Sequence, residues 1–123
     1  MAKANLVQKK VRMGQRDIIK YQLITYCFMN DIRLSNNELD CLTLLGAFVE
    51  SELAEFCNLA VEEKIFKTAQ TVRNFLTKAE RKMNLIYKDG TNKKKIGLHD
   101  DLKIQTQGNI VLDFKIFHVT QEQ

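Results

Sequence analysis

The spacing of the apolar residues changes at Met83, and this change limits the folds open to the chain more than any other feature. Up to that point apolar residues recur at helical spacing, as Val72, Leu76, Ala79 and Met83 do at i, i+4, i+7 and i+11. Beyond it they fall in short extended runs separated by turns that contain glycine. The sequence therefore predicts an α+β fold, helical in its N-terminal part and built of β-hairpins in its C-terminal part.

Capping residues divide the first part into four helices. The first is expected over residues 17–29. A second begins after Ser35, which forms an S-x-x-E capping box with Glu38, and Ser51 and Thr68 can cap a third and a fourth helix. Six apolar side chains of these elements and of the first strand are expected in the core: Leu42, Leu45, Phe56, Val72, Leu76 and Ile86.

Two hairpins are expected after the helices. Residues 85–87 and 93–98 form the first, joined by a turn that contains Asp89-Gly90. Residues 102–106 and 110–119 form a second extended pair, joined through Gly108.

Length and composition limit the classes of protein that fit. A chain of 123 residues suits one domain. No window approaches the roughly 18 apolar residues of a membrane span, and the lysine-bearing N-terminus lacks a signal-type apolar stretch, so we expect no membrane partner. Three cysteines, Cys27, Cys41 and Cys57, lack the spacing of a metal site and are expected to be buried thiols.

The charges are segregated along the chain although the formal net charge is only +4. Residues 1–20 carry six Lys or Arg against one Asp, and residues 21–63 carry Arg33 alone against eight Asp or Glu. Residues 64–95 carry ten Lys or Arg against two acids. This pattern predicts an acidic and a basic face, which suits a polyanionic partner or contact between copies of the chain.

The basic segment contains a capped helix with the run T-V-R-N-F-L-T-K at residues 71–78, then Leu85-Ile86-Tyr87 and a lysine-bearing hairpin tip. Over residues 52–98 this pattern resembles winged helix-turn-helix proteins. The resemblance implies a three-helix core with a β-wing, the outer face of the helix entering the major groove. A single winged-helix-like domain would then span 17–123, after a basic arm at 1–16. The candidate residues for binding nucleic acid or a protein partner are Gln70, Arg73, Asn74, Thr77, Lys78, Arg81, Lys88, Lys93, Lys94 and Lys95.

One feature departs from that family's pattern. The turn before Thr68 lacks the glycine commonly found there, and Glu62 and Glu63 put two carboxylates near the expected phosphate path. Neighbouring lysines would have to offset this repulsion. An ordinary solvated face on an amphipathic helix is the alternative interpretation of the same residues.

A second resemblance concerns the general character of the sequence and involves no catalytic or ligand-binding motif. The runs at residues 24–45 and 105–119 look like those of small structural-type proteins of crAss-like tailed phages. This resemblance implies a phage protein built into the virion, where a winged helix can serve as a docking module between subunits.

Two functions therefore remain. The first is a non-enzymatic virion structural component, such as a neck, connector or capsid accessory protein, whose partners are other virion subunits or itself. The alternative is a winged helix-turn-helix regulator of transcription or replication that binds double-stranded DNA. His99 and His118 have no catalytic partner at a familiar spacing and the sequence has no phosphate-binding loop, so we expect no enzymatic activity, no metal and no cofactor. The two candidate functions place the protein in the virion or in the host cytoplasm.

Overall fold

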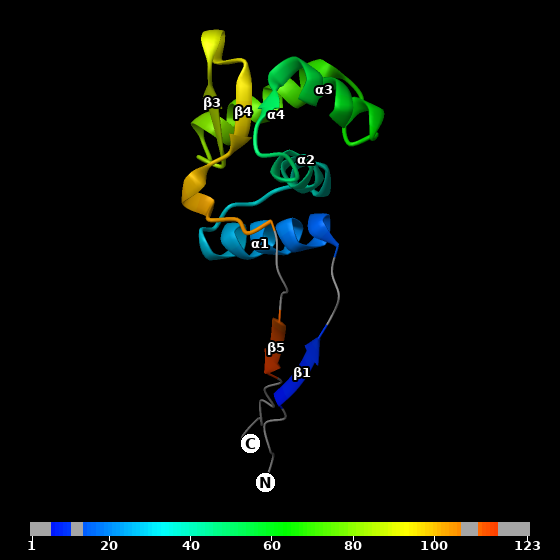
Figure 1. The fold of residues 1–123 in the computed structure, drawn as a ribbon, viewed down its shortest axis with the longest axis vertical. Coiled ribbons are helices and arrows are strands. Elements are labelled where there is room, and N and C mark those ends of the chain that lie inside the picture. The colour runs from blue at the N-terminus through cyan, green and yellow to red at the C-terminus, as the bar shows by residue number, and fades with distance from the viewer. Residues whose placement is uncertain (1–5, 11–13, 107–110, 116–123) are drawn as a thin grey trace, which may run out of the picture.

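The fold is known from a computed structural model that describes residues 6–10, 14–106 and 111–115 (Figure 1). Four helices precede most of the strands, which confirms the predicted α+β class. The helices are α1 (Gln15–Met29), α2 (Asn36–Gly46), α3 (Leu53–Glu62) and α4 (Ala69–Arg81). The strands are β1 (Leu6–Lys10), β2 (Ser51–Glu52), β3 (Ile86–Asp89), β4 (Lys95–Leu98) and β5 (Val111–Lys115). Two short 3₁₀ turns, Thr91–Lys93 and Asp100–Leu102, complete the described elements.

One hydrophobic core joins the four helices to the β3–β4 hairpin. All six side chains predicted to lie in it are buried, each with 2% or less of its surface exposed. Helix α1 contributes Ile19 and Leu23, which pack toward α2. The three cysteines are free and buried, as predicted. Burial raises the pKa of the Cys41 thiol to about 12.

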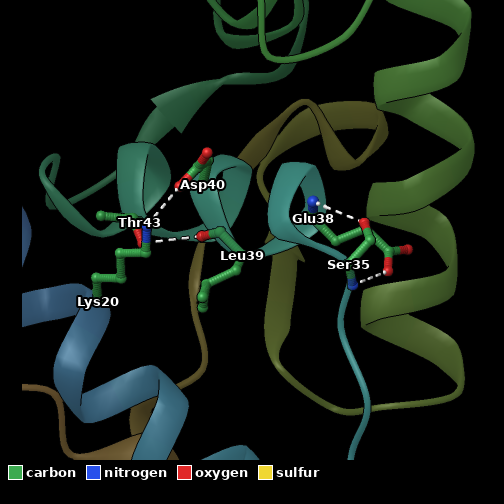
Figure 2. A network of polar contacts seen from close by, with 6 residues as sticks. All are labelled: Lys20, Ser35, Glu38, Leu39, Asp40 and Thr43. Carbon is green, nitrogen blue, oxygen red and sulfur yellow. Dashed lines mark hydrogen bonds and ion pairs between the residues drawn. The ribbon is translucent and has the colours of Figure 1, made fainter.

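Two of the three predicted caps are present. The Ser35 hydroxyl accepts a hydrogen bond from the Glu38 N–H at 3.2 Å, and the Glu38 carboxylate accepts one from the Ser35 N–H at 2.9 Å (Figure 2). The Thr68 hydroxyl accepts from the N–H of Thr71 at 3.2 Å and so begins α4. The Ser51 cap was wrong, because Ser51 lies in β2 and α3 begins after Glu52 without a side-chain cap.

The first hairpin is confirmed and belongs to a three-stranded antiparallel sheet of order β2-β4-β3. Ile86 pairs with Leu98 and Asp89 with Lys95, while β2 adds to the other edge of β4 through Ser51 and Ile96. Gly97 lies so close to the Tyr87 ring that a Cβ there would come within 2.6 Å of its hydroxyl. A larger residue at position 97 would therefore displace the Tyr87 ring, whose hydroxyl donates to the Glu50 carboxylate.

The second predicted pair was wrong in its partner. Leu102 ends a 3₁₀ turn and residues 103–106 form no strand, whereas β5 pairs in antiparallel register with β1, Leu6 opposite Lys115. The rest of the predicted 110–119 strand lies outside the described residues. In Figure 1 the β1–β5 ribbon extends from the side of α1 that faces away from α2. None of the described helices is long and apolar enough to cross a membrane.

Candidate nucleic-acid interface

The outer face of α4 carries a line of polar side chains opposite its buried face. Val72, Phe75, Leu76 and Ala79 point into the core. The remaining positions leave Gln70, Asn74, Thr77 and Arg81 at i, i+4, i+7 and i+11 along the opposite face. All but the half-buried Thr77 are exposed. The predicted outward orientation of these side chains is thus present on a single face.

Two of these side chains bond to each other. The Gln70 amide nitrogen donates to the Asn74 amide oxygen at 2.9 Å. This bond fixes the orientation of both amides one turn apart. The bond uses the Gln70 nitrogen and the Asn74 oxygen, so the Gln70 oxygen can still accept and the Asn74 nitrogen can still donate a hydrogen bond.

Lys88 makes its contacts within the protein and is mostly buried. Its ammonium donates to the Thr77 hydroxyl at 3.3 Å and lies 3.9 Å from the Glu80 carboxylate. Only 14% of the Lys88 side chain is exposed. These contacts tie β3 to α4 and hold the hairpin in a fixed position beside the helix, so Lys88 positions the surface.

The tip of the hairpin carries the exposed lysines. Lys93 and Lys94 are exposed and make no ion pair with any described residue. The backbone oxygen of Lys94 accepts from the N–H of Leu53 at 2.6 Å, which fastens the tip to the start of α3. In Figure 1 the β3–β4 hairpin stands at the end of the body opposite to α1.

Acidic residues lie beside the tip of the hairpin, where Glu52 of β2 pairs with Lys95. Lys95 is 3.8 Å from the Glu50 carboxylate. A shallow depression of about 460 Å³ between β2 and the hairpin is lined by Glu50, Glu52, Lys94 and Lys95 among others. Two carboxylates therefore lie near the lysines of the hairpin tip and weaken the positive field there.

The remaining candidates divide in the same way. Lys78 is 3.8 Å from the carboxylate of Glu38 at the start of α2. Arg73 and Arg81 are exposed and have no ion-pair partner in the described part of the chain. Of the predicted cations, four are thus left for an anionic ligand: Arg73, Arg81, Lys93 and Lys94.

The turn between α3 and α4 forms without glycine. The N–H of Lys64 donates to Val61 O at 3.0 Å and that of Ile65 to Ala60 O at 3.0 Å, the two bonds of a Schellman motif. Lys64 takes the left-handed conformation, with φ of 60°, that glycine usually occupies. The turn therefore keeps the geometry that usually needs glycine, with Lys64 in the strained left-handed conformation.

One of the two carboxylates in that turn is neutralised. Glu63 accepts from the Arg16 guanidinium at 2.9 and 3.5 Å, so a cation from the first turn of α1 offsets it. Glu62 is exposed. The repulsion expected from this turn is thus reduced to one carboxylate.

The sequence prediction omitted two cations beside α4. Lys67 precedes the Thr68 cap, Lys82 follows the last residue of the helix, and both are exposed. Their places immediately before and after a predicted helix were the signal that could have identified them.

Histidines, cysteines and acidic residues are the possible metal ligands in the described part of the chain. They form no group of three there that could hold a metal ion. His99 accepts a hydrogen bond from the N–H of Asp101 at 3.1 Å, and Asp100 and Asp101 lie in a 3₁₀ turn. The His99 side chain therefore caps the short turn that contains the two aspartates.

Comparisons of the chain with protein-family models, with curated proteins and with solved structures found no match.

Proposed function

We propose that the chain is a non-enzymatic module that binds double-stranded DNA through a winged-helix arrangement. The observation that carries the proposal is the order of elements α2, β2, α3, α4, β3 and β4 with a sheet of order β2-β4-β3. This order supplies a three-helix core and a two-stranded wing. It also sets the exposed polar face of α4 and the lysines of the hairpin tip on one substructure.

The two parts of the surface would have different tasks. Gln70, Asn74 and Arg73 on α4 present the groups that distinguish base edges in the major groove. Lys93 and Lys94 at the hairpin tip are compact charges suited to phosphates, which set affinity and not sequence. The bond between Lys88 and Thr77 keeps the two parts in a fixed relation, so less ordering free energy is lost on binding.

Titration of a labelled duplex by fluorescence anisotropy at several salt concentrations tests the proposal. With three or four phosphates neutralised, the logarithm of the association constant should fall with the logarithm of salt with a slope of about −3. Arg73→Ala should cost on the order of 1 to 3 kcal/mol of binding free energy, and Lys94→Ala should weaken all sequences alike.

Lys20→Gln is the matched control. It removes one positive charge from α1, where Lys20 bonds to Asp40 of α2 at 3.1 Å (Figure 2), away from the hairpin. Its affinity should stay close to that of the unaltered protein. Salt-independent affinity, or no binding at low salt, would remove the DNA proposal.

A virion structural component is the second candidate, and exposed apolar side chains favour it. Phe28 and Met29 at the end of α1 are 87% and 78% exposed, which suits a surface covered by another protein. Co-sedimentation of the purified chain with assembled phage particles would support this role. Particles that assemble fully without the chain would exclude it.

A further inference from the structure

The tip of the β3–β4 hairpin begins with the only Asp-Gly pair of the chain. Asp89 is the last residue of β3, and Gly90 follows it outside the strand. Each of the other aspartates is followed by a residue with a side chain, and no asparagine precedes a glycine. The backbone nitrogen of Gly90 is therefore less hindered than the nitrogen that follows any other Asp or Asn.

The carboxyl group of Asp89 lies against that nitrogen. The N–H of Gly90 donates to Oδ1 of Asp89 at 2.7 Å. Because Oδ1 is bonded to Cγ, this hydrogen bond keeps Cγ close to the nitrogen. A bond between these two atoms would close a succinimide ring, and holding two reacting atoms together lowers the entropic part of the barrier.

The turn itself favours glycine at position 90. Gly90 has φ of 83°, a conformation that residues with a Cβ rarely adopt, and a Cβ there would lie 3.3 Å from Cγ of Lys95. Asp89 and Gly90 are both exposed, so water reaches the carboxyl group and the peptide bond. The geometry that forms the hairpin thus also brings together an unhindered nitrogen, a carboxyl group and water.

We propose that Asp89 is a site of spontaneous modification, at which the folded hairpin converts aspartate into isoaspartate. The nitrogen of Gly90 attacks Cγ of Asp89, a C–N bond forms, and the bond from Cγ to one carboxyl oxygen breaks. That oxygen leaves as water, with the proton of the nitrogen and one proton from solvent. Water then opens the ring: addition at Cγ restores aspartate, and addition at the main-chain carbonyl gives isoaspartate. The solvent proton returns when the new carboxyl group ionises.

The product changes the start of the hairpin tip. In isoaspartate the main chain runs through Cβ and Cγ, which adds a methylene group to it at the residue that pairs with Lys95. The former main-chain carbonyl becomes the free carboxylate, so the net charge stays the same. The added length falls between β3 and the exposed Lys93 and Lys94, and it should loosen the pairing that sets their position.

Incubation of the full folded chain for weeks at neutral pH, in water enriched in heavy oxygen, measures the reaction. Each passage through the succinimide adds a labelled oxygen at residue 89, and electron-transfer mass spectrometry of peptides distinguishes isoaspartate from aspartate. Label and isoaspartate should accumulate at Asp89 about tenfold faster than at Asp100, an exposed aspartate followed by Asp101. The folded chain should react at least as fast as the chain unfolded in urea, because the fold holds the reacting atoms together.

The aged protein also links the site to DNA binding. The isoaspartate form should bind a duplex several-fold more weakly than fresh protein, a consequence that rests on the proposed function, whereas the mass-spectrometric result does not. Fresh protein that binds no DNA would remove the proposed function and leave the chemistry at Asp89 standing. Equal affinity of the fresh and isoaspartate forms would overturn the effect on the tip.

Substitutions at the pair test the ring closure. Asp89→Glu lengthens the side chain, requires a larger ring and should abolish the reaction at this position. Asp89→Asn provides ammonia as the leaving group and should react faster than the unaltered chain. Asp100→Glu is the matched control and should leave the rate at Asp89 unchanged. Equal rates at Asp89 and Asp100, or a rate in urea well above that of the folded chain, would overturn the proposal.

Discussion

Lys64 holds the most informative backbone conformation in the molecule. Its φ of 60° lies in the left-handed region, where a Cβ crowds the following carbonyl oxygen. The Schellman bonds on either side of it keep the residue there, because they satisfy the last carbonyls of α3. The angle between α3 and α4 is therefore maintained at a local conformational cost.

Lys64→Gly should remove that cost. Left-handed backbone costs a residue with a Cβ roughly 1 to 2 kcal/mol, and the extra freedom of glycine in the unfolded chain offsets part of this. We expect the free energy of unfolding to rise by about 0.5 to 1 kcal/mol, measured by urea denaturation. Lys67→Gly, at an exposed residue outside the left-handed region, is the control and should not stabilise the protein.

Cys41 makes stability depend on pH in alkaline solution. Burial raises the pKa of its thiol from 9.0 to about 12, so between these values the folded protein keeps a proton that the unfolded chain loses. The stability that this proton contributes is complete below pH 9 and is lost as the pH rises toward 12. The free energy of unfolding should fall by up to about 1.4 kcal/mol per pH unit in this window.

Comparison with Cys41→Ala isolates that contribution. The substitution removes the thiol, so the difference in unfolding free energy between the two proteins should shrink as the pH rises above 9. Tyr87, whose pKa is also raised by burial and by its bond to Glu50, is present in both and cancels. A difference that stays constant from pH 8 to pH 11 would contradict the assignment.

At the scale of the element, local signals placed the helices well. The capping box at Ser35 and the Thr68 cap could be predicted from the sequence because each bond joins residues only three positions apart. Helix α1 and the β3–β4 hairpin were predicted close to their observed bounds for the same reason. The periodicity that put Val72 and Leu76 in the core is likewise a property of one helix.

The errors concern contacts between distant segments. Serine is a common N-cap residue, yet Ser51 lies in β2, where it pairs with Ile96 of β4, a residue distant in the sequence. The segment at 111–115 was predicted to pair with its sequence neighbour and pairs with β1 instead. At the candidate site, the exposure of Arg73 was predictable from helical spacing, but the burial of Lys88 against Thr77 and Glu80 was not, since it depends on where β3 meets α4.

Alanine substitutions at the three serine and threonine positions separate caps from strand residues. Ser35→Ala and Thr68→Ala each remove the acceptor for an orphan N–H and should lower the free energy of unfolding by about 1 kcal/mol. Ser51→Ala removes no side-chain bond to the helix and should cost less than about 0.5 kcal/mol. Equal losses at all three positions in thermal or urea denaturation would mean that Ser51 caps α3 after all.

At the scale of the whole molecule, residues 14–106 build a hydrophobic core. Its buried apolar side chains run from Ile18 to Leu102. The ribbon of β1 and β5 has its main contacts within itself. The main contacts of residues 14–106 and those of the β1–β5 ribbon are therefore made separately.

A chain restricted to residues 14–106 should fold. We expect its helical circular dichroism to be that of the full chain and its melting temperature to stay within a few degrees, because the core from Ile18 to Leu102 is retained. A chain that starts at residue 31 is the contrasting truncation, since it loses Ile19 and Leu23 of α1 and should unfold at markedly lower temperature. Loss of cooperative melting in the 14–106 chain would show that the ribbon supports the core.

The pairing of β1 with β5 also sets an order in time. Leu6 lies opposite Lys115, so β1 finds its partner only after more than a hundred further residues have been added. At ribosomal rates of 5–20 residues per second, this delay is roughly 5 to 20 s. Through that interval the early strand has both edges open, and a nascent chain in this state is a target for chaperones or for pairing with a neighbouring nascent chain on the same message.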